Sequence, residues 1–361
     1  MIVVVKIGTS SVTGDQGDLD EGALVKLCHE IAIARAAGHE VVVVSSGAVA
    51  AGLPALGFLE RPHDVGTLQA VAAVGQPRLM ERFGACLGAH DLVPGQVLLT
   101  SYDFGHRSQY LHARETLARL LELGVVPIVN ENDTVADDEI RYGDNDRLAA
   151  LVAHLVGAQL LVLLTDTAGV FTADPRLDAG ASLIEEIVEF DAALEAAAGG
   201  AGTARGSGGM ASKLGAAKIA AWAGVRAVIA HAAEPDVVLH AINGTAVGTV
   251  VQPRPERLSS RRLWIAFARG SSGRIVVDDG ARRALLDGGR SLLHAGVRTI
   301  DGDFDAEDAV EIVGSDGRVF AKGLVRADAV VLREVAGLRT DDLPEGAPRE
   351  AVHRDDFVVL P

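Results

Sequence analysis

Short apolar runs, many rich in β-branched residues, recur through the first 255 positions and alternate with longer segments of helical spacing. The runs lack polar alternation, which is typical of parallel strands covered on both faces. Between the first two runs, Leu24, Leu27, Cys28 and Ile31 follow the i, i+3, i+4, i+7 pattern of a helix. We therefore predict an α/β fold, a three-layer αβα sandwich with a mainly parallel sheet. The predicted strands are Ile2–Ile7, Val41–Val44, Gln96–Leu99, Val125–Val129, Leu160–Leu164, Arg226–Ala230 and Gly248–Val251.

Helix boundaries can be read at two places in this region. Asp20 suits the N-cap of the first helix and Gly38 its C-terminal stop. A second helix is predicted over Leu148–Val156, directly before the strand that begins at Leu160.

The texture of the chain changes after the polar, proline-bearing segment 252–257. We predict a first domain over residues 1–255, a linker over 256–262 and a small β-rich domain over 263–361. Tight turns such as Ser315-Asp316-Gly317 separate short strands there. The predicted elements of this domain are the strands Leu263–Phe267, Arg274–Val277 and Val310–Val313 and the helix Asp279–Asp287.

Composition and charge narrow the function. The net charge of −16 at pH 7 argues against a protein whose main role is to bind nucleic acid or an anionic membrane. Cys28 and Cys86 have no metal or redox spacing, which favours small buried side chains in a reduced, cytoplasmic setting. The chain opens directly on an apolar strand, so no signal peptide and no membrane association are expected.

The first candidate site lies at the end of the first strand. Ligands of parallel α/β sheets collect beyond the carboxyl ends of the strands. Lys6 ends an apolar run and is followed by Gly8-Thr9-Ser10, whose small residues leave backbone N–H groups free. A positive charge beside such a loop suits phosphate, although a strand-end lysine can also simply extend its amine into solvent. The loop is not a Walker A motif.

Three further strands end in polar residues. Ser45-Ser46-Gly47 follows the second strand and fits either a substrate site or a helix cap. Asn130-Glu131-Asn132-Asp133-Thr134 follows the fourth and suits recognition of an ammonium and a carboxylate, with an Asx turn as the alternative. Thr165-Asp166 follows the fifth.

Two more segments carry polar residues into the start of a helix. Gly143-Asp144-Asn145-Asp146-Arg147 contains more acid and amide groups than one helix cap needs. Gly206-Ser207-Gly208-Gly209-Met210-Ala211-Ser212-Lys213 is a glycine-rich loop with a lysine just inside the helix that it opens. A glycine loop, a helix N-terminus and a lysine together favour phosphate binding.

Taken in order, these motifs resemble the amino-acid kinase superfamily, and the branch that phosphorylates glutamate in particular. The resemblance runs over almost the full length, and the β-rich tail is similar to a PUA domain. It implies ATP-dependent phosphorylation of the γ-carboxylate of L-glutamate, the first step of proline biosynthesis, with ATP as co-substrate and Mg²⁺ as cofactor. Ser207, where threonine often stands, and Ala211, where a hydroxyl is usual, are small departures from the pattern.

The resemblance also implies roles for individual residues. Lys6, Lys213 and Asp146 would be catalytic: Lys6 would contact the transferring phosphate, Lys213 would stabilise the developing charge, and Asp146 would orient the two lysines. Ser46, Asp133 and Asn145 would hold glutamate. No residue is assigned as a metal ligand, because Mg²⁺ would be held mostly by ATP phosphates and water, with few ligands from the protein. The nucleotide would be bound by Lys6, Gly8, Thr165, Asp166, Ser207, Gly208, Gly209, Met210, Ala211, Ser212 and Lys213.

This chemistry is coherent with the residues. A carboxylate is already ionised at neutral pH, so its phosphorylation needs no general base. It needs in-line positioning of the two reactants and suppression of the repulsion between two anions. Two lysines and helix N-termini supply these, and no Ser/His/Asp set stands at the strand ends.

Two alternative functions remain open beside the phosphorylation of glutamate. Within the superfamily, relatives act on acetylglutamate, aspartate, carbamate or UMP, but usually lack such a tail. An RNA-binding or regulatory protein is the alternative of another class, yet acidic residues outnumber basic ones in 263–361. The resemblance further implies feedback inhibition by proline and a homo-oligomer. Because an acyl phosphate is labile to water, its transfer to a partner, glutamyl-phosphate reductase, is a hypothesis from the pathway.

Overall fold

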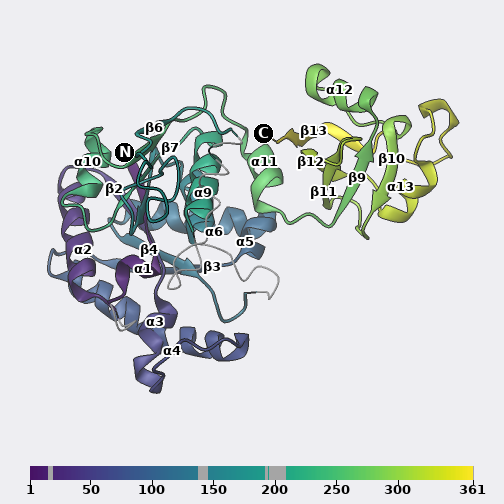
Figure 1. Cartoon of the computed structure of the whole chain (residues 1–361). Coiled ribbons are helices and arrows are strands. Elements are labelled where there is room, and N and C mark those ends of the chain that lie inside the picture. The colour runs from purple at the N-terminus through teal and green to yellow at the C-terminus, as the bar shows by residue number, and fades with distance from the viewer. Residues whose placement is uncertain (15–18, 137–144, 192–193, 195–208, 361) are drawn as a thin grey trace. The chain divides into compact units, whose positions relative to one another are not determined.

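The computed structural model describes residues 1–14, 19–136, 145–191, 194 and 209–360 (Figure 1). The chain divides into two compact units, Met1–Arg257 and Leu258–Pro361. No helix of the described residues is long and apolar enough to cross a membrane. Both cysteines are free thiols, with Cys28 buried and Cys86 half-buried.

The first unit is built on one sheet, with the strand order β3-β4-β2-β1-β5-β7-β8-β6 among the described residues. All neighbouring strands are parallel except β7 and β8, so the predicted mainly parallel α/β sheet is confirmed. The strands are β1 (Ile2–Ile7), β2 (Glu40–Ser45), β3 (Pro94–Leu99), β4 (Val126–Glu131), β5 (Leu160–Thr165), β6 (Glu186–Ile187), β7 (Arg226–His231) and β8 (Thr249–Val251).

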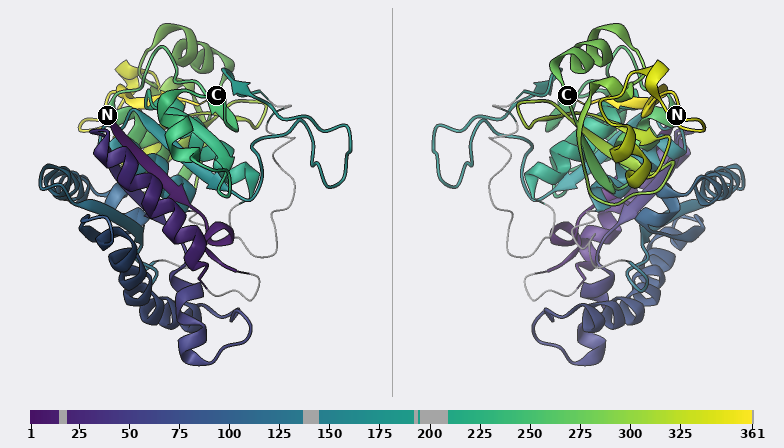
Figure 2. Two further views of the ribbon diagram at one scale, coloured as in Figure 1. Left: turned by 90° about the vertical axis from the view of Figure 1, so that its left-hand side faces the viewer. Right: turned by 90° about the vertical axis from the view of Figure 1, so that its right-hand side faces the viewer.

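Helices cover both faces of this sheet. α2, whose N-cap Asp20 accepts a hydrogen bond from the amide of Ala23 as predicted, packs with α4 and α10 on one face (Figure 2). On the opposite face, α7 and α9 pack on each other, α7 contacts β1, and α9 contacts β7. The helices are α1 (Thr9–Val12), α2 (Glu21–Ala36), α3 (Ala48–Gly52), α4 (Val65–Gly88), α5 (Ser101–Gly105), α6 (Arg107–Glu122), α7 (Asn145–Leu155), α9 (Met210–Trp222) and α10 (Val237–Asn243).

The alternation along β1 places its one lysine. Val3, Val5 and Ile7 belong to the core shared with α2 and α4. Because side chains of a strand alternate between the two faces, Lys6 points to the opposite face with Val4. On that face, Lys6 forms an ion pair with Asp146 of α7.

A close contact of two backbones joins α3 and α4. A Cβ added at Gly75 would lie 1.7 Å from the carbonyl oxygen of Ala48, and one at Gly52 would lie 2.1 Å from that of Val71. Only glycine allows the two helices to approach this closely. The contact holds the middle of α4 against the segment that directly follows Ser46.

The second unit contains a five-stranded sheet with the order β10-β9-β11-β12-β13. Its neighbours are antiparallel except β9 and β11. The β-rich tail is thereby confirmed. The elements are α11 (Ser260–Leu263), β9 (Gly273–Val277), α12 (Asp279–Gly288), β10 (Val297–Asp301), β11 (Ala309–Val313), β12 (Val319–Val325), α13 (Ala329–Val335) and β13 (Val352–Val359).

One predicted element of this unit is wrong. Residues 263–267 form no strand: α11 ends at Leu263 and a π-helix follows over Trp264–Ala268. The side chain of Ser259 accepts a hydrogen bond from the amide of Arg262 and starts the helix. A continuous apolar run does not distinguish a short buried helix from a buried strand, and here the cap decides for the helix.

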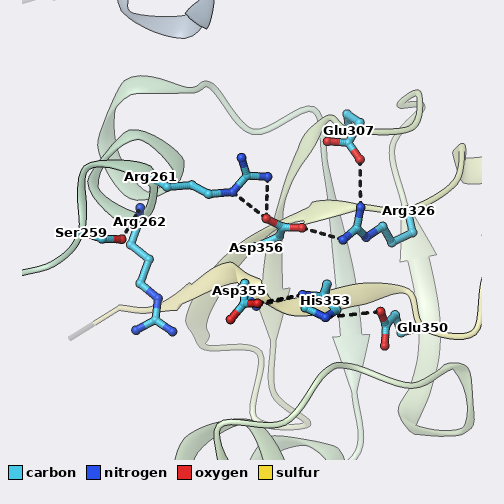
Figure 3. A network of polar contacts seen from close by, with 9 residues as sticks. All are labelled: Ser259, Arg261, Arg262, Glu307, Arg326, Glu350, His353, Asp355 and Asp356. Atoms are coloured by element: carbon cyan, nitrogen blue, oxygen red, sulfur yellow. Dashed lines mark hydrogen bonds and ion pairs between the residues drawn. The ribbon is translucent and has the colours of Figure 1, made fainter.

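A buried carboxylate ties the start of this unit to its last strand. Asp356 in β13 is 4% exposed. Arg261 in α11 donates from Nε to its Oδ1 atom at 2.7 Å, and Nη2 of Arg326 lies 2.9 Å from its Oδ2 atom (Figure 3). Arg326 also contacts Glu307, whereas the side chain of Arg262 points away from the group. The four charged residues thus form a local network within this unit.

Candidate active site

The carboxyl ends of β1, β2, β4 and β5 lie side by side. The register pairs Ile7 with Ser45 on one side and with Leu164 on the other. The amide of Ser46 donates to the carbonyl oxygen of Ile7 at 3.1 Å. Polar residues that are far apart in the sequence therefore meet at one edge of the sheet.

Asp146 is the centre of a buried ion-pair group. It lies in the first turn of α7 and is 0% exposed, while Lys6 and Lys213 are 3% and 6% exposed. Lys6 Nζ contacts Oδ1 of Asp146, and Lys213 Nζ lies 3.1 Å from Oδ2. The hydroxyl of Ser212 donates to the same Oδ2 atom at 3.3 Å. The structure thus brings together the three residues predicted to be catalytic.

The electrostatics of Asp146 follow from its partners. Burial alone would raise the pKa of this carboxyl, but the charges and hydrogen bonds of Lys6 and Lys213 outweigh burial and lower the pKa below its ordinary value. Asp146 is therefore ionised at neutral pH and orients both ammonium groups. Gly8 leaves room beside them, because a Cβ there would lie 3.3 Å from Lys6 Nζ.

A second group of side chains joins the ends of β2 and β4 to α7. Nδ2 of Asn145 donates to Oγ of Ser46 at 2.9 Å and to Oδ1 of Asn130 at 3.2 Å. Its own Oδ1 atom is buried and has no hydrogen-bond partner among the described residues. An unpaired buried carbonyl oxygen costs free energy unless a ligand donates to it. Ser46 and Asn145, both predicted to bind the substrate, therefore do meet.

Asp133 stands apart from this group. It lies in a turn after β4, where the amide of Val135 donates to the carbonyl oxygen of Asn132 at 3.1 Å and the hydroxyl of Thr134 donates to Oδ1 of Asn132 at 2.6 Å. Asp133 is half-buried, and burial raises its pKa, opposed in part by the charge of Arg61. No hydrogen bond of the described residues joins Asp133 to Asn145 or Ser46.

The described residues predicted to bind the nucleotide lie at the end of β1, at the start of α1, at the end of β5 and at the start of α9. Thr165 ends β5, is buried, and donates from Oγ1 to Asp166 at 3.2 Å, while Asp166 is exposed. Gly209 is the N-cap of α9, which begins with Met210, Ala211 and Ser212. Ser207 and Gly208 lie outside the described residues, as do Gly143 and Asp144. The N-terminus of α9 thus stands next to Lys213, as a phosphate site requires.

One residue of the site was missed by the sequence reasoning. Gln76 in α4 is 7% exposed, and its Oε1 atom accepts a hydrogen bond from Nδ2 of Asn130 at 2.8 Å. The available signal was its position: it occupies the stripe of buried residues formed by Ala72, Leu79 and Phe83. A polar residue on such a stripe needs a buried partner.

The chain is similar to known proteins over almost its whole length. The model of the amino acid kinase family matches residues 1–231, and that of the PUA domain matches residues 273–346. A glutamate 5-kinase of Myxococcus xanthus (strain DK1622) is 45% identical over 362 residues, covering 99% of this chain and 96% of the relative. A glutamate 5-kinase of Mycolicibacterium vanbaalenii is 46% identical, with the same coverage. A solved isopentenyl phosphate kinase shares the fold, with a TM-score of 0.51, 19% identity, and coverage of 70% of this chain and 100% of that one.

Proposed function

This chain belongs to the amino acid kinase family, and we propose that it transfers the γ-phosphoryl group of ATP to the γ-carboxylate of L-glutamate. The product is L-glutamyl 5-phosphate, and the reaction is the first step of proline biosynthesis. The relatives that carry the name glutamate 5-kinase match both units of the chain, which favours this acceptor over the others used in the family.

One observation carries the proposal: two buried lysines share one buried carboxylate at the ends of the central strands. Lys6, Lys213 and Asp146 together carry one positive charge in excess. In a site of low dielectric, such an excess stabilises the charge that spreads over the transferring phosphoryl group. Asp146 holds the two ammonium groups in place before the reactants arrive, which lowers the cost of reorganisation.

The acceptor would be held on the other side of α7. Asn145 offers Oδ1 as an acceptor for the ammonium group of glutamate, and Asp133 supplies a negative charge for the same group. Ser46 orients Asn145 through the hydrogen bond between Oγ and Nδ2. Because the γ-carboxylate is already an anion, no residue is needed to remove a proton from it.

The nucleotide would be held on the side of α9. We assign this role to Gly8, Thr165, Asp166, the loop from Ser207 and the first turn of α9. No cluster of three or more His, Cys, Asp or Glu side chains suited to a metal ion occurs in the described parts of the chain. We propose that Mg²⁺ is held mostly by the nucleotide phosphates and water, where it would neutralise part of their charge.

Further properties are proposed with this function. Residues 1–255 would bind both substrates, and the PUA domain after the linker would modulate activity or assembly. Deletion of residues 263–361 with unchanged activity, inhibition and oligomeric state would rule out that role. Inhibition by proline, a homo-oligomer, transfer of the product to glutamyl-phosphate reductase and a cytoplasmic location complete the proposal.

The reaction can be tested in one assay. The chain is incubated with ATP, Mg²⁺ and hydroxylamine, which traps an acyl phosphate as a hydroxamate. L-glutamate is compared with N-acetylglutamate, aspartate and no acceptor, and the Lys213→Ala variant is the matched control. We expect a hydroxamate signal that requires glutamate and is lost in the variant. A signal with another acid alone, or none, would refute the proposed substrate.

A further inference from the structure

A chain of amide side chains crosses the proposed substrate site from α4 to α7. Nδ2 of Asn130 donates to Oε1 of Gln76 at 2.8 Å, and Oδ1 of Asn130 accepts from Nδ2 of Asn145 at 3.2 Å. The second hydrogen of Nδ2 of Asn145 goes to Ser46. Gln76 is thus linked to Asn145 through a single intermediate side chain.

The backbone N–H of Glu131 sets the direction of every hydrogen bond between these amide side chains. The amide N–H of Glu131 donates to Oδ1 of Asn130 at 2.9 Å. A backbone N–H can only donate, so this atom of Asn130 must be the oxygen and the other the nitrogen. It follows that Gln76 turns Oε1 towards Asn130 and that Asn145 turns Nδ2 towards it. The Oδ1 atom of Asn145 is left as an acceptor.

The polar atoms at the two ends of this series of amide side chains lack hydrogen-bond partners among the described residues. Nε2 of Gln76 and Oδ1 of Asn145 are buried, and neither has a hydrogen-bond partner among the described residues. Such groups are rare in folded proteins because each costs free energy. Oδ1 of Asn145 is accounted for by an ammonium group of the substrate. Because Nε2 of Gln76 makes no hydrogen bond among the described residues, we infer that the contribution of this residue comes from its Oε1 atom.

The backbone of Gln76 is held firmly. Gly75, its neighbour, lies directly against the carbonyl group of Ala48, where even a Cβ would clash. Pro77, the next residue, lies inside α4, where its ring restricts the conformation of Gln76. The backbone from which the side chain of Gln76 reaches Asn130 is therefore restricted on both sides.

We propose that Gln76 is a positioning residue: its Oε1 atom fixes Asn130, and Asn130 holds Asn145 so that Oδ1 faces the ammonium group of the substrate. Gln76 itself does not touch the reactants. The inference rests on the proposed function, because it assumes that Asn145 binds the ammonium group of glutamate. It assigns to α4 a part in selecting α-amino acids over plain dicarboxylates.

The test compares L-glutamate with glutarate, which lacks the amino group, as substrates or as competitive ligands. Gln76→Met keeps the length of the side chain and removes both polar atoms. We expect kcat/KM for glutamate to fall about tenfold, while KM for ATP and the affinity for glutarate stay within about threefold of wild type. Equal losses for glutamate and glutarate, or no loss for either, would overturn the proposal.

Gln76→Glu is the second variant and remains informative if the Met variant does not fold. It keeps an oxygen opposite Nδ2 of Asn130. Its added negative charge repels glutarate, which carries two negative charges, at least as strongly as glutamate, whose ammonium group leaves one, so it does not lower the ratio of glutamate affinity to glutarate affinity. We expect this ratio to stay at or above the wild-type value. A tenfold fall in this ratio would contradict the role of Oε1.

A double-mutant cycle checks that Gln76 acts through Asn145. In an Asn145→Ala background, Gln76→Met should have no further effect on glutamate, because the acceptor that it positions is gone. Additive losses would refute the linkage. The wild-type chain separates the two hypotheses: no glutamate-dependent hydroxamate means that the proposed function fails, whereas normal activity with an unchanged ratio in the variants means that only this inference fails.

Discussion

Lys213 reaches the carboxylate of Asp146 across 67 positions of the chain, with 3.1 Å between Nζ and Oδ2. The contact joins the first turns of α7 and α9, two helices that pack on each other. Each helix would otherwise bring an isolated buried charge to this place, at a high cost in free energy. The pairing therefore stabilises the fold and prepares the site at the same time.

Replacement of Asp146 by Asn should damage both stability and activity. Asp146→Asn leaves two buried ammonium groups without their shared counterion, and breaking a buried ion pair in this way costs about 3–5 kcal/mol. We expect a large fall in the midpoint of thermal unfolding and a fall in kcat of at least about a hundredfold. Calorimetry and steady-state kinetics measure the two effects. An unfolding midpoint equal to that of wild type would contradict the ion-pair account.

Replacement of Lys213 should act mainly on turnover. In Lys213→Ala, Asp146 keeps its contact with Lys6, so less stability is lost than in Asp146→Asn. We expect kcat to fall by about 10²–10³-fold, because a charge opposite the phosphoryl group is removed. Lys218, on the same helix and half-buried over the ring of Phe190, is the matched control. Similar losses of kcat in Lys213→Ala and Lys218→Ala would show that the effect is not specific.

Asp133 should lower the stability of the folded chain at neutral pH while it contributes to glutamate binding. Burial raises its pKa, so the folded state binds this proton more tightly than the unfolded chain, and ionisation costs stability as the pH rises through the raised value. Asp133→Asn should therefore raise the unfolding midpoint by a few degrees at neutral pH, and the gain should shrink towards about pH 4. The KM for glutamate should rise at least about tenfold. Thermal unfolding at two pH values, with glutamate titrations, checks both; a lower midpoint at neutral pH would contradict the sign.

The glycines of α4 should respond in opposite directions to the same change. Gly75→Ala places a methyl group against the carbonyl oxygen of Ala48 and should cost about 1–3 kcal/mol or more, with a higher KM for glutamate. Gly84 lies in the same helix, and a Cβ there meets nothing within 4 Å. Gly84→Ala should therefore stabilise the chain by about 0.5–1 kcal/mol. Denaturant unfolding of both variants decides, and equal effects would refute the contact.

The carboxylate of Asp356 should stabilise the second unit. Asp356→Ala removes the partner of Arg261 and Arg326, both of which can still reach solvent, so we expect a loss of about 1–3 kcal/mol. Faster hydrogen exchange of the amides in β13 and α11 of the full chain measures this loss. Arg262→Ala, beside the network but turned away from it, should leave the exchange unchanged. Protection of β13 that is the same in Asp356→Ala and wild type would refute the role.

Local pattern was sufficient for the central strands. β1 was predicted to the residue, and β2, β4 and β5 within two residues at either end, because β-branched runs bounded by polar residues have few other readings. It failed at 263–267, where an apolar run fits a buried helix equally well. The strand order followed from no local signal, since it depends on which strands pair across the sheet.

For the site, the residue types were visible, and the family resemblance already implied that Asp146 orients the two lysines. No local pattern showed this pairing, because it requires the face of β1 that carries Lys6 to meet the start of α7. Gln76 carried no motif, because its importance comes from a neighbour 54 positions away. Buried hydrogen bonds of this kind are set by tertiary structure, which a single sequence does not display.

The link between Arg261 and Asp356 has a consequence for evolution. It fastens the point where the chain enters the second unit to the strand by which it leaves, so this unit closes upon itself. A module with its two ends clasped together can be joined to another gene, or lost from it, by a single fusion or truncation. The second unit is thus a module that could be transferred between genes, because the ion pair that joins its two ends lies inside the unit itself.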